Sequence, residues 1–295
     1  MGVQMQLPPK PKHINDLEFV RILTPYVFTR HIASGRSVVD VGCGFGHGTW
    51  LLATNDVERV AALDLDEANV RRVSGFGGDF QNCAALVMDA QRLGFRDHSF
   101  QLAACFEVIE HVSTPDMLLS ELRRILNADG ILVLTTPNRT VRLLPLQRPW
   151  NPEHLYEYTL KDLRKVLQKH FPAFAILGIY GDPGFYEHYR KKWQQSPTHG
   201  YLGWLVWIIR RLTPASVRGW IRNRLYHSNV ARSPSFDRDL LNRALRDPVP
   251  KTWPFYVRDV GEDCLNFFAI CGFDNQIIQR TVDEINESAD RRSLF

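Results

Sequence analysis

Three observations predict an α/β fold for this chain of 295 residues. Seven short apolar runs have the length of strands, and helical apolar patterns lie between most of them. A glycine-rich stretch at 42–48 joins the first run to the next helix. With 44% hydrophobic and 23% charged residues, the composition is that of a globular protein. We therefore expect a Rossmann-like, seven-stranded sheet with helices on both faces and a helical insertion before the last strand.

The expected elements follow in chain order. Asn15 and Asp16 can cap a first helix with apolar positions at Phe19, Ile22, Leu23, Tyr26 and Val27. Five strands are expected at 37–41, 60–63, 84–88, 102–106 and 131–135. An apolar stripe predicts a helix at 116–126, and the Thr159–Asp162 spacing resembles the capping box of a helix at 160–169. The last two strands are expected at 174–180 and 265–272.

Turn signals divide the chain into a Rossmann-like domain at 1–180, completed by 261–282, and an insertion at 181–260. Between Glu187 and Asp237 the insertion has no acidic residue, whereas 190–232 holds nine Lys and Arg residues and four of the seven tryptophans. An amphipathic lid that rests on an anionic membrane surface is one interpretation. A lid packed on the domain and a nucleic-acid surface are the others. The unbroken apolar stretch at 204–209 favours lipid over nucleic acid.

The first twenty residues lack the apolar core of a signal peptide, and no run of about 18 uncharged apolar residues exists. We therefore expect a cytoplasmic protein that associates with membranes through the insertion. The five cysteines have no CxxC spacing, which predicts buried reduced thiols rather than disulfides or a zinc cluster.

The glycine stretch predicts a ligand-binding loop. Gly42, Gly44 and Gly46 follow the strand carboxylate Asp40 at GxGxG spacing. A dinucleotide fingerprint would need a further glycine where His47 or Thr49 stands, which disfavours a nicotinamide or flavin cofactor. Beneath the loop, Asp40 would attract an ammonium group and repel a pyrophosphate.

Two further acids lie at expected strand ends. Asp64 is suited to accept both hydroxyls of a ribose, and Asp89, followed by Ala90, can accept from the amine of a base. Each alone is equally explained as a helix cap or a turn residue. Together with the glycine loop they outline one crevice at the carboxyl ends of parallel strands.

The order of these motifs resembles that of the class I S-adenosylmethionine-dependent methyltransferases, over about 15–180 and the last strand. The matching segments are VDVGCGFG (39–46), ALDLD (62–66), MDA (88–90), LAACFEVIEHV (102–112), LRRILNADGILVLTTPN (122–138) and NPEHLYEYT (151–159). The resemblance implies S-adenosyl-L-methionine as cofactor. It places Asp40 near the methionine amino group through water, Gly42 and Gly44 against the cofactor, and Asp64 on the ribose. It also places Leu65 over the adenine, Asp89 at the adenine amine, and Phe106 along the methionine arm.

A second constellation is Glu107, Glu110 and His111, which a helical turn after the fourth strand would project to one side, with His154 further along the chain. In one interpretation Glu107 supports the cofactor and His111 caps a turn or acts alone. In the other, all four residues hold Mg²⁺, Mn²⁺ or Zn²⁺. The set resembles the Glu-Glu-His-His site of small-RNA 3′-end 2′-O-methyltransferases and a grouping in ubiquinone-pathway O-methyltransferases. In both, His111 is the candidate catalytic residue, because a hydroxyl acceptor must lose a proton.

These observations predict an S-adenosylmethionine-dependent methyltransferase acting on an oxygen of a small or lipid-linked molecule. The alternatives are an RNA 2′-O-methyltransferase and a non-catalytic partner protein that binds the cofactor. RNA action predicts strongly salt-dependent oligonucleotide binding, whereas a non-catalytic partner predicts cofactor binding without turnover.

Overall fold

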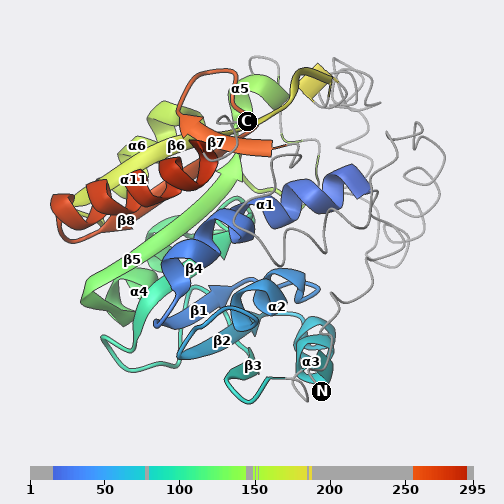
Figure 1. Cartoon of the computed structure of the whole chain (residues 1–295), viewed down its shortest axis with the longest axis vertical. Coiled ribbons are helices and arrows are strands. Elements are labelled where there is room, and N and C mark those ends of the chain that lie inside the picture. Colours follow the sequence, from blue (N-terminus) through green and yellow to red (C-terminus); the bar gives the residue numbers. More distant parts are fainter. Residues whose placement is uncertain are drawn as a thin grey trace.

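The computed structural model describes residues 16–76, 80–143, 149, 151, 153–184, 186–187 and 255–290. These residues form one eight-stranded sheet in the order β3-β2-β1-β4-β5-β8-β6-β7, with helices on both faces (Figure 1). The strands are β1 (Ser37–Val41), β2 (Arg59–Asp64), β3 (Cys83–Val87), β4 (Phe100–Phe106), β5 (Leu126–Pro137), β6 (Ala173–Gly181), β7 (Phe255–Asp259) and β8 (Asn266–Gly272). The helices are α1 (Asp16–Ala33), α2 (His47–Ala53), α3 (Glu67–Phe76), α4 (Pro115–Ile125), α5 (Arg139–Arg142), α6 (Leu160–Leu167) and α11 (Asn275–Asp290).

The sheet has a parallel part and an antiparallel part. Strands β3, β2, β1, β4 and β5 pair in parallel, whereas β8 is antiparallel to both β5 and β6. The expected Rossmann-like fold is confirmed, but with eight strands instead of seven. The additional strand is β7, which pairs antiparallel with β6 at the sheet edge. Its sequence lies at the end of the range that we assigned to the insertion.

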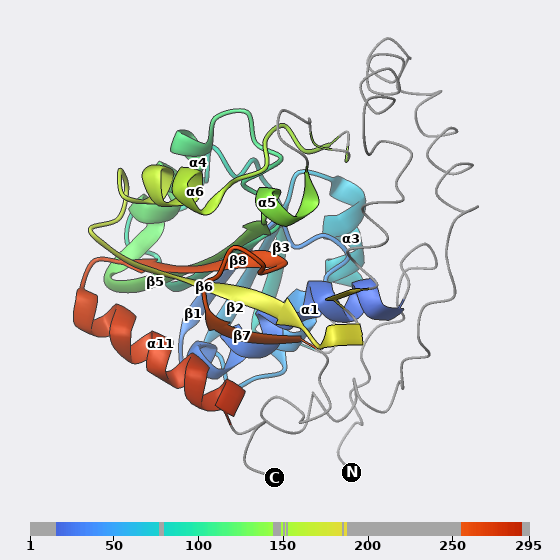
Figure 2. The ribbon, with the colours of Figure 1, turned by 90° about the horizontal axis from the view of Figure 1, so that it is seen from above.

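Alternating apolar residues build a core on each face of the sheet. In β4, Leu102 and Ala104 belong to the core under α1, α2 and α11, whereas Ala103 and Cys105 belong to the core under α4 and α6. Figure 2 shows α11 and α4 on opposite sides of the sheet. Because both faces are covered, the central strands consist mostly of apolar residues, and these apolar runs predicted the strands from the sequence.

The expected capping box of α6 is confirmed, with Thr159 bonded to the Asp162 amide and Asp162 bonded back to Thr159.

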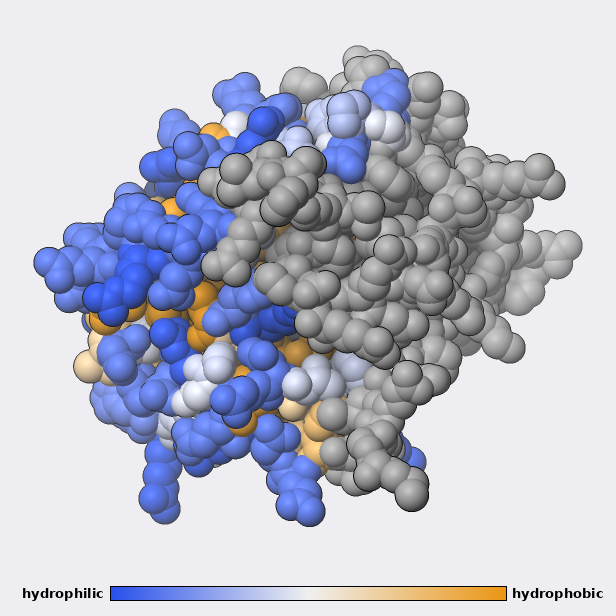
Figure 3. Space-filling model, viewed as in Figure 1, coloured by the Kyte–Doolittle hydropathy of each residue, from blue (hydrophilic) through white to orange (hydrophobic). Residues whose placement is uncertain are grey.

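Other features of the described residues concern the thiols and the surface. All five cysteines are free, and burial raises the pKa of Cys83 to about 11. Among the described residues, no helix is long and apolar enough to cross a membrane. The described part of the face shown in Figure 3 is mostly hydrophilic. The basic segment at 190–232 lies outside the described residues.

Candidate functional site

The glycine loop has the conformation that its glycines permit. Gly42, Gly44 and Gly46 have φ angles of 76°, 52° and 80°, in the left-handed region. The Gly42 and Cys43 amides donate to the Leu63 carbonyl at 2.8 Å, which ties the loop to the end of β2. A Cβ atom on Gly42 would lie 2.4 Å from Cγ2 of Val108. The loop therefore packs against the segment that follows β4, and only glycine fits at position 42.

Asp64, at the end of β2, holds the loop from the other side. Its Oδ2 accepts a hydrogen bond of 2.8 Å from the Gly44 amide, and its Oδ1 accepts one from the Asp66 amide at the same distance. The carboxylate is partly exposed. It is therefore fixed in orientation by the loop that it borders, and each of its oxygens retains a lone pair for a ligand hydroxyl.

Asp40 is completely buried beneath the loop. Its two oxygens accept hydrogen bonds from Tyr26 Oη on α1, at 3.0 Å, and from Thr49 Oγ1 on α2, at 2.6 Å. Burial raises the pKa of Asp40 to about 6, although both hydrogen bonds oppose this shift. Asp40 thus connects two helices to β1, and its role toward the cofactor's amino group remains a prediction.

The other predicted cofactor residues lie at neighbouring strand ends. Leu65 is 74% exposed, as an adenine-covering residue without a ligand would be. Asp89 is exposed, and its Oδ1 accepts a hydrogen bond of 2.9 Å from the Gln91 amide. Ala90 beside it is half-buried. Phe106 is buried at the end of β4, with its ring 4.6 Å from that of Tyr26 in a T-shaped contact. All four positions stay candidates for contact with the cofactor.

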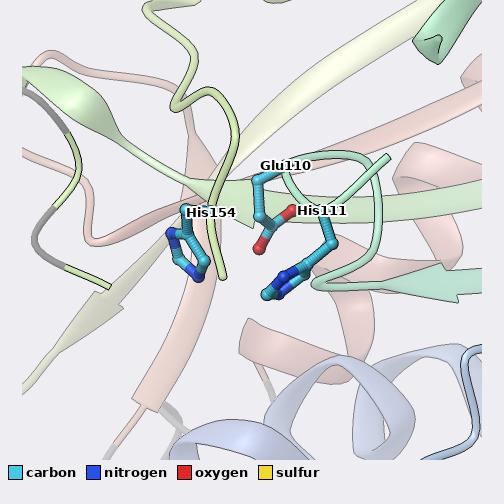
Figure 4. Close-up of side chains that lie close together, drawn as sticks. All are labelled: Glu110, His111 and His154. Carbon is cyan, nitrogen blue, oxygen red and sulfur yellow. The ribbon is translucent and has the colours of Figure 1, made fainter. Parts of the chain in front are cut away.

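Three of the four predicted metal ligands converge. One ligand atom each from Glu110, His111 and His154 lies within 4.8 Å of the others (Figure 4). The two imidazole rings are perpendicular, with centroids 4.7 Å apart. The Glu110 carbonyl accepts from the Leu155 amide at 2.8 Å, which brings the segment carrying His154 to the turn after β4.

Hydrogen bonds set the tautomers of both rings. Nδ1 of His111 lies 3.0 Å from the Glu153 carbonyl, and Nδ1 of His154 lies 2.8 Å from Oε1 of Glu157. Both partners are acceptors, so each Nδ1 donates the hydrogen bond. Burial and the neighbouring His154 lower the pKa of His111 below 6.5. At neutral pH, His111 is therefore a neutral base.

Glu110 is fully buried and incompletely bonded. Its Oε2 accepts from Thr136 Oγ1 at 3.0 Å, but its Oε1 has no hydrogen-bond partner among the described residues. Burial, followed by the charge of Glu107, raises the pKa of Glu110 well above its ordinary value. A buried oxygen of this kind is costly unless something binds it, which makes Glu110 a candidate ligand residue.

Glu107 corrects the predicted four-residue site, because it does not join this group. A hydrogen-bonded turn forms between Val108 and His111, but Glu107 precedes it with a left-handed φ of 57°, so the expected helical turn does not include Glu107. Its Oε1 accepts from Thr135 and Asn266, and Arg21 of α1 contacts its Oε2 at 3.3 Å. Glu107 therefore ties α1, β5 and β8 together.

Residues that the sequence did not single out support the site. Glu157 is fully buried and bonds His154, and Arg142 lies 3.5 Å from the same carboxylate oxygen. Burial opposes ionisation of Glu157, but the hydrogen bond from His154 and the charge of Arg142 outweigh it and lower its pKa. The three-residue spacing of His154 and Glu157 was a visible signal, whereas nothing in the sequence marked Arg142 or Arg21.

A comparison with known protein families identifies the domain that contains the glycine loop. Residues 39–134, which carry the glycine loop, Asp64 and the Glu110–His111 turn, match the methyltransferase domain family. This part of the chain is a methyltransferase domain. The cofactor of that family is S-adenosylmethionine.

The methyltransferase domain is similar to several curated proteins over about half of the chain. A probable S-adenosylmethionine-dependent methyltransferase of Mycolicibacterium smegmatis is 31% identical over 53% of this chain and 60% of its own length. A ubiquinone biosynthesis O-methyltransferase of Xylella fastidiosa is 32% identical over 45% of this chain and 53% of its own length. The chain thus matches little more than half the length of these relatives.

Solved structures show the same fold at low identity. The YcgJ protein of Bacillus subtilis aligns with a TM-score of 0.52 at 18% identity, over 86% of this chain and 99% of its own. The [4+2]-cyclase SpnF aligns with a TM-score of 0.51 at 15% identity, over 86% of this chain and 81% of its own. Because a cyclase shares this fold, the fold alone does not determine the reaction.

Proposed function

We propose that this protein transfers the methyl group of S-adenosylmethionine to an oxygen of a small or lipid-linked acceptor. The observation that carries the proposal is the position of His111. Its turn packs on the glycine loop, through Val108 against Gly42, and its Nε2 is available as a base. A base beside the cofactor loop is what methylation of a hydroxyl requires.

The cofactor is proposed to lie above the glycine loop. Asp64 would accept the ribose hydroxyls through the oxygens that already hold Gly44 and Asp66. Leu65 would cover the adenine, Asp89 and Ala90 would face its amine, and Phe106 would line the methionine arm. The 74% exposure of Leu65 gives a flat ring an accessible apolar surface.

The proposed reaction is an in-line displacement at the sulfonium. The acceptor oxygen forms a bond to the methyl carbon as the carbon–sulfur bond breaks, which leaves S-adenosylhomocysteine. The hydroxyl proton passes to Nε2 of His111. The Glu153 carbonyl bonds Nδ1 of this ring, which leaves Nε2 as the nitrogen that can accept the proton.

Glu110, His111 and His154 also fit a divalent cation. The carboxylate of Glu110, whose Oε1 is unpartnered among the described residues, and the two imidazoles form a donor set suited to Zn²⁺ or Mn²⁺ and less to Mg²⁺. The Glu157–His154 hydrogen bond is the support that metal-binding histidines usually have. Such a cation would lower the pKa of an acceptor hydroxyl.

The proposed acceptor class is based on the names of the relatives and on the composition of the segment at 190–232. Relatives include a ubiquinone biosynthesis O-methyltransferase and a 2-methyl-6-phytyl-1,4-hydroquinone methyltransferase of Synechocystis, 28% identical over 44% of this chain. By analogy with these relatives, we propose that the acceptor of this chain is a phenol with an apolar tail. The nine basic residues and four tryptophans at 190–232 would place it on anionic membranes. Replacing Arg210, Arg211, Arg218 and Arg222 by Gln should then abolish binding to anionic vesicles at low salt, and unchanged binding would remove that role.

The test is incubation with methyl-labelled S-adenosylmethionine and three fractions: hydroxylated aromatic compounds, total lipid and total RNA. We expect label in the first or second fraction, on oxygen as determined by mass spectrometry. Label in RNA would instead support the RNA 2′-O-methyltransferase. Cofactor binding without transfer to any fraction would identify a non-catalytic partner protein. Dialysis against a chelator, followed by metal analysis and re-assay, decides whether the Glu110 group holds a cation.

A further inference from the structure

A cavity of about 630 Å³ lies outside the site described above, between α5, α6 and the turn before β8. Its lining includes Asn138, Thr140, Thr159, Leu160 and Phe267. None of the lining residues belongs to the group of Glu110, His111 and His154.

One wall of this cavity is strongly basic. Lys161, Arg164 and Lys165 follow α6 at i, i+3 and i+4, so all three project from the same face of the helix. All three are exposed, and none forms an ion pair with another described residue. Glu262 is the only acidic residue in the lining. The wall therefore carries a net positive charge.

This arrangement places like charges side by side on one face of α6. Charges three and four residues apart repel one another, and the Asp162 carboxylate is already hydrogen-bonded to Thr159 in the capping box. The opposite face of α6 packs its Leu163 and Leu167 into the core. The basic face is therefore not needed for packing, and an anion would relieve its repulsion.

The cavity also has apolar lining. Leu160 lines it and is half-buried, whereas Phe267, which is 1% exposed, belongs to the core below the cavity. A site with an apolar part and one cationic wall favours a ligand that has an apolar part and an anionic group. A free inorganic anion would leave the apolar part unused, whereas a neutral amphiphile would leave the cations unpaired.

We infer that this cavity binds the phosphate or carboxylate of an amphiphilic small molecule. The anionic group lies against Lys161, Arg164 and Lys165, and the apolar body extends over Leu160. The inference goes beyond the proposed methyl transfer and does not depend on it, because binding here involves neither the glycine loop nor His111.

The probe is dodecyl phosphate below its micelle concentration, titrated into the full chain by calorimetry, with inorganic phosphate and dodecyl maltoside in parallel. We expect dodecyl phosphate to bind at least 10-fold more tightly than either comparison compound, and its affinity to fall as salt rises. Equal binding of the neutral amphiphile would overturn the inference. Hydrogen exchange with the probe present should show protection at 159–168, and protection only elsewhere would also overturn it.

Two variants localise the binding. Lys161→Gln, Arg164→Gln and Lys165→Gln together should weaken dodecyl phosphate binding at least 10-fold. The matched control replaces Arg92, Arg96 and Arg280 by Gln, three exposed cations outside the cavity, and should change affinity less than 2-fold. If both triple variants lose affinity equally, the effect is that of net charge and the cavity is not the site. The four-Arg variant at 210–222 should keep this binding, and its loss there would assign the probe to the insertion instead.

Discussion

The glycine-loop region and the histidine region differ in how completely their polar atoms are hydrogen-bonded. In the first, Asp40 and Asp64 have both carboxylate oxygens hydrogen-bonded by the protein. In the second, Oε1 of Glu110 is buried without a partner among the described residues, and Nε2 of His111 carries a lone pair without a described donor. The loop region is therefore a preformed cofactor cradle, whose carboxylates are held by the protein. The histidine region has polar atoms that are available to bind a ligand or a proton.

This difference predicts that substitutions in the two regions affect different properties of the protein. Changes in the loop region should alter cofactor affinity and stability. Changes in the histidine region should alter turnover and leave cofactor affinity unchanged.

The largest effect is expected at the histidines. His111→Ala removes the proposed base and should lower kcat by roughly 10²- to 10⁴-fold, with an unchanged Kd for S-adenosylhomocysteine. His170→Ala is the matched control, because that ring bonds Asp116 at the surface of α4. Initial rates and calorimetry give the two readouts. A His111→Ala enzyme with normal kcat would remove His111 from the reaction.

Next in size is Gly42→Ala. The new Cβ meets Val108 at 2.4 Å and the residue must keep a φ of 76°, so we expect a loss of about 2–4 kcal/mol in unfolding free energy. Adding Val108→Ala should recover the part due to the clash but not the part due to φ. Urea denaturation measures both. Full recovery in the double variant would show that φ costs nothing here.

Asp64→Ala should be somewhat milder. Loss of charge-assisted hydrogen bonds to the ribose should weaken cofactor binding by about 1.5–3 kcal/mol. The matched control is Asp66→Ser, two residues on, which can keep the hydrogen bond that Asp66 makes to the Ala68 amide. Calorimetry with S-adenosylhomocysteine distinguishes them. Unchanged affinity in Asp64→Ala would exclude this carboxylate from the cofactor site.

The smallest effect is expected in the pH dependence of stability. The pKa of Asp40 is about 6 in the folded chain and about 3.8 when unfolded, so the folded state holds this proton more tightly. Its contribution is fully present below pH 3.8 and is lost as the pH rises through 6. Asp40→Asn should therefore match the parent near pH 4 and exceed it by at most about 3 kcal/mol near pH 8. Parallel stability curves for the two proteins would refute the shifted pKa.

The two regions also differ in how far the sequence predicts them. The loop, Asp64 and Asp89 follow strands directly, so a short stretch of sequence contains both the strand and its functional residues. The strands themselves are continuous apolar runs, and β1 to β6 and β8 lie close to the predicted positions. Strand β7 was missed because its five residues pair only at the sheet edge.

The histidine region depends on tertiary contacts that no spacing reveals. The bonds from Leu155 to the Glu110 carbonyl bring His154 to His111, and they join parts of the chain more than 40 residues apart. Glu107 was misassigned because a left-handed backbone at that residue breaks the assumed helical turn. Arg21, which contacts Glu107 from α1, is 86 residues away in the sequence.

The most direct test of the independence of the two regions is a double-mutant cycle of Asp64→Ala and His111→Ala. Kd for S-adenosylhomocysteine and kcat are measured for the parent, both single variants and the double variant. We predict that Asp64→Ala accounts for the whole change in Kd and His111→Ala for the change in kcat, with free-energy changes additive within about 0.5 kcal/mol. A coupling above about 1 kcal/mol, or a Kd that His111→Ala weakens as much as Asp64→Ala does, would contradict the division into a preformed cofactor cradle and a separate reactive group.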